Sequence, residues 1–540
     1  MSNPFDVCIV GAGPAGLQAA DSLTAEGLNV IVLERGPTVG TFFRQYPRHR
    51  QLISINKVST GLSDPELKLR FDWNSLLSAD GPLFTDVTRR YFPPADAYVG
   101  YLEDFATRLD GKIRCDAEVT DVARDAEGFR VTLGDGDVIA AKQVIVATGV
   151  SKPWQAEIEG GDLIECYTEF DPTPERFRDK RVLILGKGNS AFETADSLIE
   201  EAASIHVMSP NPVKLAWNTH FVGHLRAVNN NFLDTYQLKS QNAMIDARPT
   251  RVERGEDGSL VVTADMTAAA GHEIVLHYDH IIACTGFRFD PSIMGEGTTP
   301  ELRHFDKFPA MGANWESEAA PGLWYAGTIM QCRDFKKTMS GFVHGFRHNV
   351  EALCRFVAAR AKGEALETDT VALDDLAAEV VDRASTSAAM FLQPGFLGDI
   401  VALSGPEAGT RYRDMPVEWA KQNVMTEGDW LTVTLEFGDF GGNPLHVMRK
   451  HEAGGENPDP FIHPVLRHWR DGEVVAMTHL TDHLDSDWRS AEARDKGTGT
   501  VLRMTFADRG AELPPGQVAL EQAGDFLSRQ QIGRMTEAAE

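Results

Sequence analysis

Short apolar runs alternate with amphipathic stretches over the first two thirds of the chain. Residues 5–10 and 30–33 are almost wholly apolar, and the helical stretch 17–26 lies between them. Runs this short and this apolar are typical of strands buried on both faces of a parallel sheet. The pattern therefore predicts a strand, a helix and a second strand, the βαβ unit of an α/β fold.

The same arrangement recurs in the middle of the chain. Residues 181–185 form an apolar run, and we expect a helix over 190–203 and a strand over 205–208. Two further apolar runs, 144–147 and 281–284, are each followed by Thr-Gly. A strand that ends this way is expected where the chain leaves a nucleotide domain beside its cofactor. Because each lies downstream of one βαβ unit, we expect two nucleotide domains, the second inserted into the first.

The pattern changes from about residue 362. A helical stretch is expected near 370–383, residues 430–437 alternate as a half-buried strand does, and 474–477 is a second apolar strand. We therefore predict an α/β fold with two Rossmann-like dinucleotide-binding domains and a mixed α+β C-terminal domain. The expected domains are residues 1–150 with 290–361, residues 151–289, and residues 362–540. The last domain would cover the substrate pocket or form an oligomer contact, for example in a homodimer.

Histidines are frequent in this last domain. His479 and His483 are four residues apart and would share one face of a helix. Imidazole and carboxylate groups can bind zinc or iron. No H-E-x-x-H or C-x-x-C motif accompanies them, so we expect solvated or capped histidines and no metal site.

A G-x-G-x-x-G turn follows the first strand at Gly11, Gly13 and Gly16. In such a turn the first glycine permits the tight bend and the second lets the backbone approach a pyrophosphate. The third lets the helix pack on the strand. The helix N-terminus offers free N–H groups and a positive dipole end to the phosphates. Glu34 ends the second strand, where its carboxylate can accept hydrogen bonds from both ribose hydroxyls.

A second glycine turn, Gly186 and Gly188 followed by Ala191, comes after the run 181–185. The next strand ends at Ser209 and not at an acid. A missing acid removes the repulsion that would exclude a 2′-phosphate, so NADPH is favoured and NADH is the alternative. Lys214 or Arg226 could meet that phosphate, although single basic residues in a loop are more often only solvated.

Composition and net charge exclude some classes of binding partner and of chemistry. The chain has 540 residues and a formal net charge of -27, which repels nucleic acid and anionic membrane surfaces. Neither a long apolar span nor a secretory signal is evident, so we expect a cytoplasmic protein. The six cysteines are scattered without a C-x-x-C pair, so the dithiol relay of flavin disulfide reductases has no visible nucleophile.

Several long stretches resemble the flavin-containing monooxygenase group of two-dinucleotide-binding flavoproteins. Within that group the chain is also similar to a eukaryotic flavoprotein of the endoplasmic reticulum. The matching stretches are residues 46–57, 71–77, 91–93, 341–347, 435–438, 461–465 and 485–488. The resemblance implies FAD in the first domain and a nicotinamide dinucleotide in the second, with the segment 322–327 returning to the flavin.

The resemblance also implies individual site residues. For FAD they are Gly11, Gly13, Pro14, Ala15, Gly16, Glu34, Arg35, Val119, Thr148, Gly149, Gly327, His344 and Arg347. For the nicotinamide dinucleotide they are Gly186, Gly188, Asn189, Ser190, Ala191, Thr285 and Gly286. Asn56 and Lys57 would lie beside the reacting flavin, where an amide can donate a hydrogen bond to a bound peroxide. The alternatives are that Asn56 fixes a turn and that His344 and Arg347 cap and solvate a helix.

The function that this resemblance implies is an NAD(P)H-consuming monooxygenase. A C4a-(hydro)peroxyflavin, formed with molecular oxygen, would oxygenate an amine or a sulfur on a small or carrier-bound substrate. One departure weakens the inference of oxygenation chemistry from the resemblance, because Glu165 stands where the linker motif of these monooxygenases carries a histidine. The alternatives are a flavin reductase or oxidase without oxygen insertion, and a flavin-bearing interaction protein.

Overall fold

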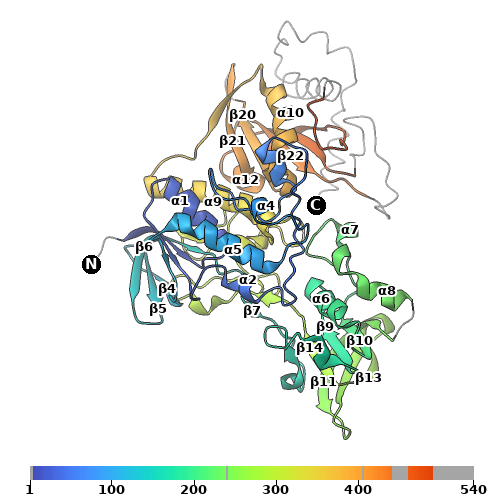
Figure 1. Ribbon diagram of the computed structural model, residues 1–540. Helices are drawn as coiled ribbons and strands as arrows, with labels where there is room; N and C mark the ends of the chain where they lie inside the picture. The colour runs from blue at the N-terminus through green and yellow to red at the C-terminus, as the bar shows by residue number, and fades with distance from the viewer. Residues whose placement is uncertain (1–3, 239–240, 404–406, 441–459, 491–540) are drawn as a thin grey trace.

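The computed structural model describes residues 4–238, 241–403, 407–440 and 460–490. Three sheets organise these residues, and Figure 1 shows the C-terminal sheet (orange) on one side of the first domain and the second domain (green) on the other. Among the described residues, no helix is long and apolar enough to cross a bilayer.

The first sheet is built around β1, whose neighbours β2 and β6 both run parallel to it. Helix α1 (Pro14–Ala25) joins β1 to β2, as the apolar pattern predicts. The strand order is β3 (Ile113–Arg114), β2 (Val30–Leu33), β1 (Phe5–Val10), β6 (Val138–Val146), β5 (Phe129–Leu133), β4 (Val119–Arg124). Strand β18 (Leu323–Tyr325) returns from far along the chain and pairs with β6, which brings the segment 322–327 back to this domain.

Helices cover the first sheet. The long helix α9 (Val343–Lys362) packs against α1 and ends at Gly363, which adopts the left-handed conformation. The other helices of this part are α2 (Thr41–Gln45), α3 (Pro65–Leu69), α4 (Phe84–Val87) and α5 (Ala95–Ala106). A small hairpin, β16 (Leu302–Arg303) with β17 (Phe308–Pro309), precedes β18.

The second sheet repeats the βαβ unit. Its order is β13 (His272–Tyr278), β12 (Leu260–Met266), β11 (Ala243–Arg254), β10 (Ser204–Ser209), β9 (Arg181–Leu185), β14 (His280–Ala283), β8 (Glu165–Cys166). Its helices are α6 (Asn189–Leu198), α7 (Ala216–Thr219) and α8 (Asn231–Gln237); α6 ends earlier than the expected 203. The two crossings between the domains lie side by side, because β7 (Lys152–Pro153) pairs antiparallel with β15 (Phe287–Arg288).

The described residues of the C-terminal domain form an antiparallel sheet with three helices, α10 (Leu376–Thr386), α11 (Ala388–Leu392) and α12 (Val417–Asn423). The strand order is β19 (Asp369–Ala372), β21 (Ala408–Pro416), β20 (Leu397–Ala402), β22 (Asp429–Glu436), β23 (His463–Arg470), β24 (Glu473–His479). The α/β fold class with two Rossmann-like domains and a mixed C-terminal domain is thereby confirmed.

Three expectations about the C-terminal domain are wrong. The helix expected from residue 370 begins only at Leu376, because the preceding β-branched segment pairs with β21 as strand β19. Strand β22 is not half-buried, because residues 431–435 are all buried, on both faces of the strand. His479 ends strand β24 and His483 lies in the turn after it, so the two do not share a helix face.

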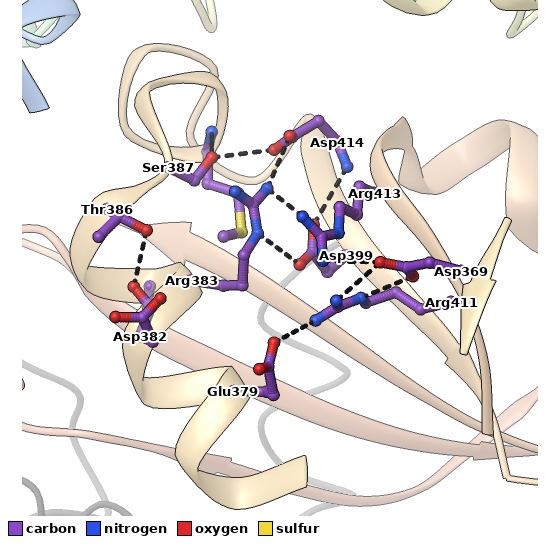
Figure 2. Close-up of polar contacts among 12 residues, drawn as sticks. Asp369, Glu379, Asp382, Arg383, Thr386, Ser387, Asp399, Arg411, Arg413 and Asp414 are labelled. Atoms are coloured by element: carbon purple, nitrogen blue, oxygen red, sulfur yellow. Dashed lines mark hydrogen bonds and ion pairs between the residues drawn. The ribbon is translucent and has the colours of Figure 1, made fainter. Parts of the chain in front are cut away.

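A buried ion network around Arg383 ties the C-terminal domain together (Figure 2), and Arg383 also pairs with Glu66 of the first domain. The guanidinium of Arg383, on α10, donates to both carboxylate oxygens of Asp399, at 2.9 and 3.2 Å. It also donates to Asp414 at 2.6 Å and, at 3.4 Å, to Glu66 of helix α3. Because Arg383 and Asp399 are buried, this pair within the C-terminal domain is shielded from water, and the Arg383–Glu66 contact links the network to the first domain.

Candidate functional site

The first glycine turn has a backbone that only glycine can supply. Gly11 has φ +106°, and a Cβ on it would lie 2.8 Å from the carbonyl oxygen of Ala147. A Cβ on Gly16 would lie 1.9 Å from the carbonyl oxygen of Gly11, so this glycine is required for α1 to pack on the turn. Gly13 is different, because no atom lies within 4 Å of its Cβ position. That open space, in front of the N-terminus of α1, fits an approaching pyrophosphate.

Glu34 is buried at the end of β2 and braces this turn. Its carboxylate accepts hydrogen bonds from the backbone N–H groups of Ala12 and Gly36, each at 2.9 Å, and from the Thr41 hydroxyl at 3.0 Å. A carboxylate has further lone pairs, so ribose binding by Glu34 stays a prediction. The neighbouring Arg35 is exposed.

The second glycine turn repeats this geometry. Gly186 has φ +115°, and its Cβ would lie 2.3 Å from the carbonyl oxygen of Cys284, whereas the Cβ position of Gly188 is open. Asn189 begins α6, and its side chain holds the segment 224–226. Its amide nitrogen donates to the His224 carbonyl at 2.9 Å, and its side-chain oxygen accepts from the backbone N–H of Arg226 at 2.9 Å. The residues present therefore fit a second dinucleotide.

A line of contacts joins the second glycine turn to the start of α9. The Arg226 guanidinium lies 5.3 Å from the ring centroid of Trp73, which belongs to the first domain. Trp73 in turn stacks on His344 with ring centroids 4.1 Å apart and an interplanar angle of 22°. Arg226, a sequence candidate for the 2′-phosphate, thus packs between Asn189 and Trp73. The two nucleotide domains meet at this stack.

His344 is buried and neutral. Burial, assisted by the nearby charge of Arg347, lowers the pKa of His344 well below its usual value. Neither ring nitrogen has a hydrogen-bond partner among the described residues. A buried imidazole left without partners is costly, so this group fits a position completed by a bound cofactor. The side chain lies in the first turn of α9, where backbone N–H groups are also available.

Arg347, one turn further along α9, has a different task. Its guanidinium donates to the carbonyl oxygens of Ser75 and Leu69, each at 2.7 Å, so it anchors the segment that carries Trp73. Burial lowers the pKa of Arg347, while the charge of Asp72 acts in the opposite direction. Direct contact of Arg347 with FAD stays a prediction.

The two residues expected beside the reacting flavin differ in environment. Asn56 is buried, and its amide nitrogen donates to the carbonyl oxygens of Thr88 (2.7 Å) and Arg90 (3.3 Å). Its side-chain oxygen has no partner among the described residues, so Asn56 presents an acceptor and not the donor that the sequence suggested. Lys57 is exposed. Their catalytic roles stay predictions.

The other expected residues lie around the two turns. Pro14 and Ala15 begin α1, and a Cβ on Gly327 would lie 2.8 Å from that of Ala15, which places the returning segment against the first turn. The hydroxyl of Thr148 is buried without a partner among the described residues, and Thr285 donates to the Trp154 carbonyl. The remaining ones are Val119, buried in β4; Gly149 and Gly286, both with positive φ; and Ser190 and Ala191 in α6.

Glu165, which occupies the linker position of the monooxygenase histidine, belongs to an ion cluster. It contacts His280 at 3.0 Å and Arg176 at 2.6 Å. Burial opposes ionisation of this carboxyl, but the hydrogen bonds from His280 and Arg176 lower its pKa overall. Glu165 is therefore a charged structural residue and not a substitute for a neutral histidine.

Comparison with known proteins fits this geometry. The family model described as pyridine nucleotide-disulphide oxidoreductase matches residues 8–327. The chain belongs to the pyridine nucleotide-disulphide oxidoreductase family. It is also 36% identical over 521 residues to the zebrafish (Danio rerio) FAD-dependent oxidoreductase domain-containing protein 2, covering 86% of this chain and 76% of that protein. The resemblance inferred from the motifs is thereby confirmed.

Solved structures show the same fold for the nucleotide domains. Bacillithiol disulfide reductase Bdr from Staphylococcus aureus superposes with a TM-score of 0.54 at 20% identity, covering 66% of this chain and 99% of that one. A flavin-containing monooxygenase from Stenotrophomonas maltophilia gives a TM-score of 0.52 at 20% identity, with coverages of 66% and 99%. One neighbour is a reductase and the other a monooxygenase, so the likeness establishes the fold alone.

The pyridine nucleotide-disulphide oxidoreductase family takes its name from disulfide chemistry, yet all six cysteines of this chain are free. Cys8, Cys284, Cys332 and Cys354 are buried. Burial raises the pKa of Cys332 to about 11 and that of Cys284 to about 12, so neither is a thiolate at neutral pH.

Sequence reasoning missed the residues through which the C-terminal domain reaches the site. His220, just after α7, stacks on Phe440 with centroids 4.0 Å apart. Gln393, just after α11, accepts from the Met339 N–H at 3.0 Å and donates to Ser340 and Asn349 at 2.9 Å each. These contacts fix the loop that leads into α9. No local pattern marks them, because each joins segments far apart in the chain.

Proposed function

We propose that the chain is an FAD-dependent, NAD(P)H-consuming monooxygenase that acts on an amine or a sulfur of a small or carrier-bound substrate. The observation that carries this proposal is the stack of Arg226, Trp73 and His344 between the second glycine turn and the first turn of α9. A nicotinamide held by the second turn would extend along this stack toward the flavin. When bound, the cofactors supply hydride transfer and the activation of oxygen.

The protein's own groups serve this chemistry by holding charge and excluding water. His344 is neutral, and its partnerless ring nitrogens and the free N–H groups of α9 are available to a reduced, anionic flavin. Phe440 of the C-terminal domain packs on His220, and the buried Phe221 packs on Phe342 next to α9, with centroids 5.8 Å apart. An apolar cover of this kind favours oxygen insertion over release of peroxide to water.

The proposal is tested by the fate of oxygen. The purified flavoprotein is supplied with NADPH, ¹⁸O₂ and, in turn, a panel of primary amines and thioethers. We expect at least one compound to gain a single ¹⁸O atom, with NADPH consumption matched by product. If every compound leaves NADPH oxidation matched by hydrogen peroxide alone, oxygen insertion is excluded for these two classes.

One observation favours the second candidate, a flavin reductase or oxidase without oxygen insertion. Both amide hydrogens of Asn56 are engaged by backbone carbonyls, so this residue offers no donor to an oxygen adduct unless one bond is broken. The peroxide-only result above would select this candidate. The sequence has no C-x-x-C pair to act as an internal dithiol, so its electron acceptor would be oxygen, a quinone or a small external disulfide.

The stack also gives a prediction about hydride transfer. Trp73→Ala removes the surface on which Arg226 and His344 rest, and we expect flavin reduction by NADPH to slow by about tenfold. Trp73→Phe keeps an aromatic face and should retain most of the rate. The measurement is anaerobic stopped-flow absorbance of the flavin. Equal rates for Trp73→Ala and wild type would show that the stack does not position the nicotinamide.

A further inference from the structure

A buried lysine lies at the carboxyl edge of the second sheet, the edge at which dinucleotides bind in this fold. Lys187 stands between the two glycines of the second turn, and its side chain is only 5% exposed. Its ammonium nitrogen lies 3.4 Å from the carbonyl oxygen of Ser209 and 3.2 Å from that of Asn211, and it forms an ion pair with Asp246. The glycine motif itself assigns no role to this lysine.

Strand register places these groups together. Ser209 is the last residue of β10 and pairs with Asp246 of the parallel part of β11. Lys187 comes two residues after Leu185, which ends β9 and pairs with Met208. Lys187, Ser209 and Asp246 therefore lie side by side at the carboxyl end of the parallel part of the sheet, on or just after the adjacent strands β9, β10 and β11. Strand β10 ends without an acid, but Asp246 on the neighbouring strand β11 places a carboxylate at the same edge.

The charges at this edge decide which nucleotide fits. An unpaired carboxylate would repel a 2′-phosphate, but the Lys187 ammonium neutralises Asp246. The two carbonyl contacts of Lys187 are at the long end of the hydrogen-bond range, so they are weak. The ammonium can exchange one of them for a phosphate oxygen, a stronger charge-assisted bond, while Asp246 keeps it in place.

We propose that Lys187 makes this protein select NADPH, by binding the 2′-phosphate of the adenosine ribose, and that Asp246 positions Lys187 for this role. The inference rests on the proposed function, because it requires a nicotinamide dinucleotide in the second domain. Arg226, a sequence candidate for the phosphate, is half-buried, and its guanidinium packs over Trp73.

Binding of nucleotide fragments tests the proposal directly. Calorimetry on the FAD-bound protein compares 2′,5′-ADP with 5′-AMP, which lacks the 2′-phosphate. Lys187→Ala is expected to weaken 2′,5′-ADP binding by about ten- to hundredfold and to leave 5′-AMP within about threefold. Lys187→Arg keeps the cation and should keep the discrimination. In Asp246→Asn the amide oxygen still accepts from Lys187 but the negative charge is gone, so 2′,5′-ADP binding should tighten by about threefold.

Lys180 provides the matched control, because it is an exposed lysine just before β9, at the opposite end of that strand from Lys187. Lys180→Ala should leave both affinities unchanged. Equal weakening of both fragments in Lys187→Ala, or no weakening of either, overturns the proposal. Bound FAD and the melting temperature show whether Lys187→Ala has folded. If it has not, the proposal is decided by whether Lys187→Arg keeps the discrimination and whether Asp246→Asn binds 2′,5′-ADP more tightly.

The experiment separates this inference from the proposed function. Fragment binding and anaerobic flavin reduction by NADPH and by NADH do not depend on oxygen insertion. A wild-type protein that discriminates 2′,5′-ADP through Lys187 and yet yields only peroxide would keep the inference and reject the monooxygenase. Oxygen insertion with equal use of NADPH and NADH would keep the monooxygenase and reject the inference about Lys187.

Discussion

Gly188→Val is expected to give a folded protein that keeps its FAD but reduces it with NADPH at least about hundredfold more slowly than wild type. The Cβ position of Gly188 is open, and its backbone, with φ −92° and ψ −178°, suits any residue, so the fold tolerates the change. The same open space is the one through which the pyrophosphate of a nicotinamide dinucleotide must approach the N-terminus of α6. A branched side chain fills it.

The measurement is anaerobic flavin reduction, with bound FAD and melting temperature recorded on the same sample. Gly13→Val should show the complementary defect in the first domain, a folded chain without FAD, because the Gly13 position is equally open. Gly100→Ala, on the exposed side of α5, is the neutral control. Gly186→Val should fail to fold, since its Cβ would lie 2.3 Å from the Cys284 carbonyl oxygen. Rapid reduction of Gly188→Val by NADPH would show that the dinucleotide does not cross the second turn.

The sequence predicts the two glycine turns and their flanking strands because each is a local device. Gly11 and Gly16, or Gly186 and Ala191, act within one βαβ unit, and the apolar runs beside them are buried in the structure as their composition requires. Strand β2, expected over 30–33, has those bounds in the structure. The return of the segment 322–327 follows from the family resemblance and not from a local pattern, and in the structure β18 pairs with β6.

The contacts that join the domains could not be predicted in this way. Trp73 and His344 lie 271 residues apart (344 − 73), and no periodicity relates them. The direction of the Asn56 amide depends on the carbonyls of Thr88 and Arg90, which only the folded loop brings near. Lys187 is part of the motif that sequence reasoning identified, but its partner Asp246 becomes visible only through the register of β10 and β11. The candidate site contacts that sequence reasoning missed thus join segments that are far apart in the chain.

A second large effect is expected at the ion network of the C-terminal domain. Arg383→Met should lower the free energy of unfolding by about 3–5 kcal/mol, because it leaves the buried carboxylate of Asp399 without its partner. Asp399 is 3% exposed at its side chain, so water cannot replace the lost hydrogen bonds. Denaturant unfolding followed by tryptophan fluorescence measures the change, and limited proteolysis shows whether the C-terminal domain opens first.

The control for this prediction is another arginine of the same domain. Arg413 is 48% exposed and makes one ion pair, 2.7 Å long, with Asp369, so Arg413→Met should cost less than about 1 kcal/mol. The pH dependence of the stability difference provides an independent check. Burial raises the pKa of Glu66, although the charge of Arg383 counteracts this. Removing that charge raises the pKa of Glu66 further. The deficit of Arg383→Met should therefore shrink as the pH falls and Glu66 is neutralised in the folded state. A deficit that is equal at all pH values would mean that lost packing, and not the uncompensated charge, destabilises the variant.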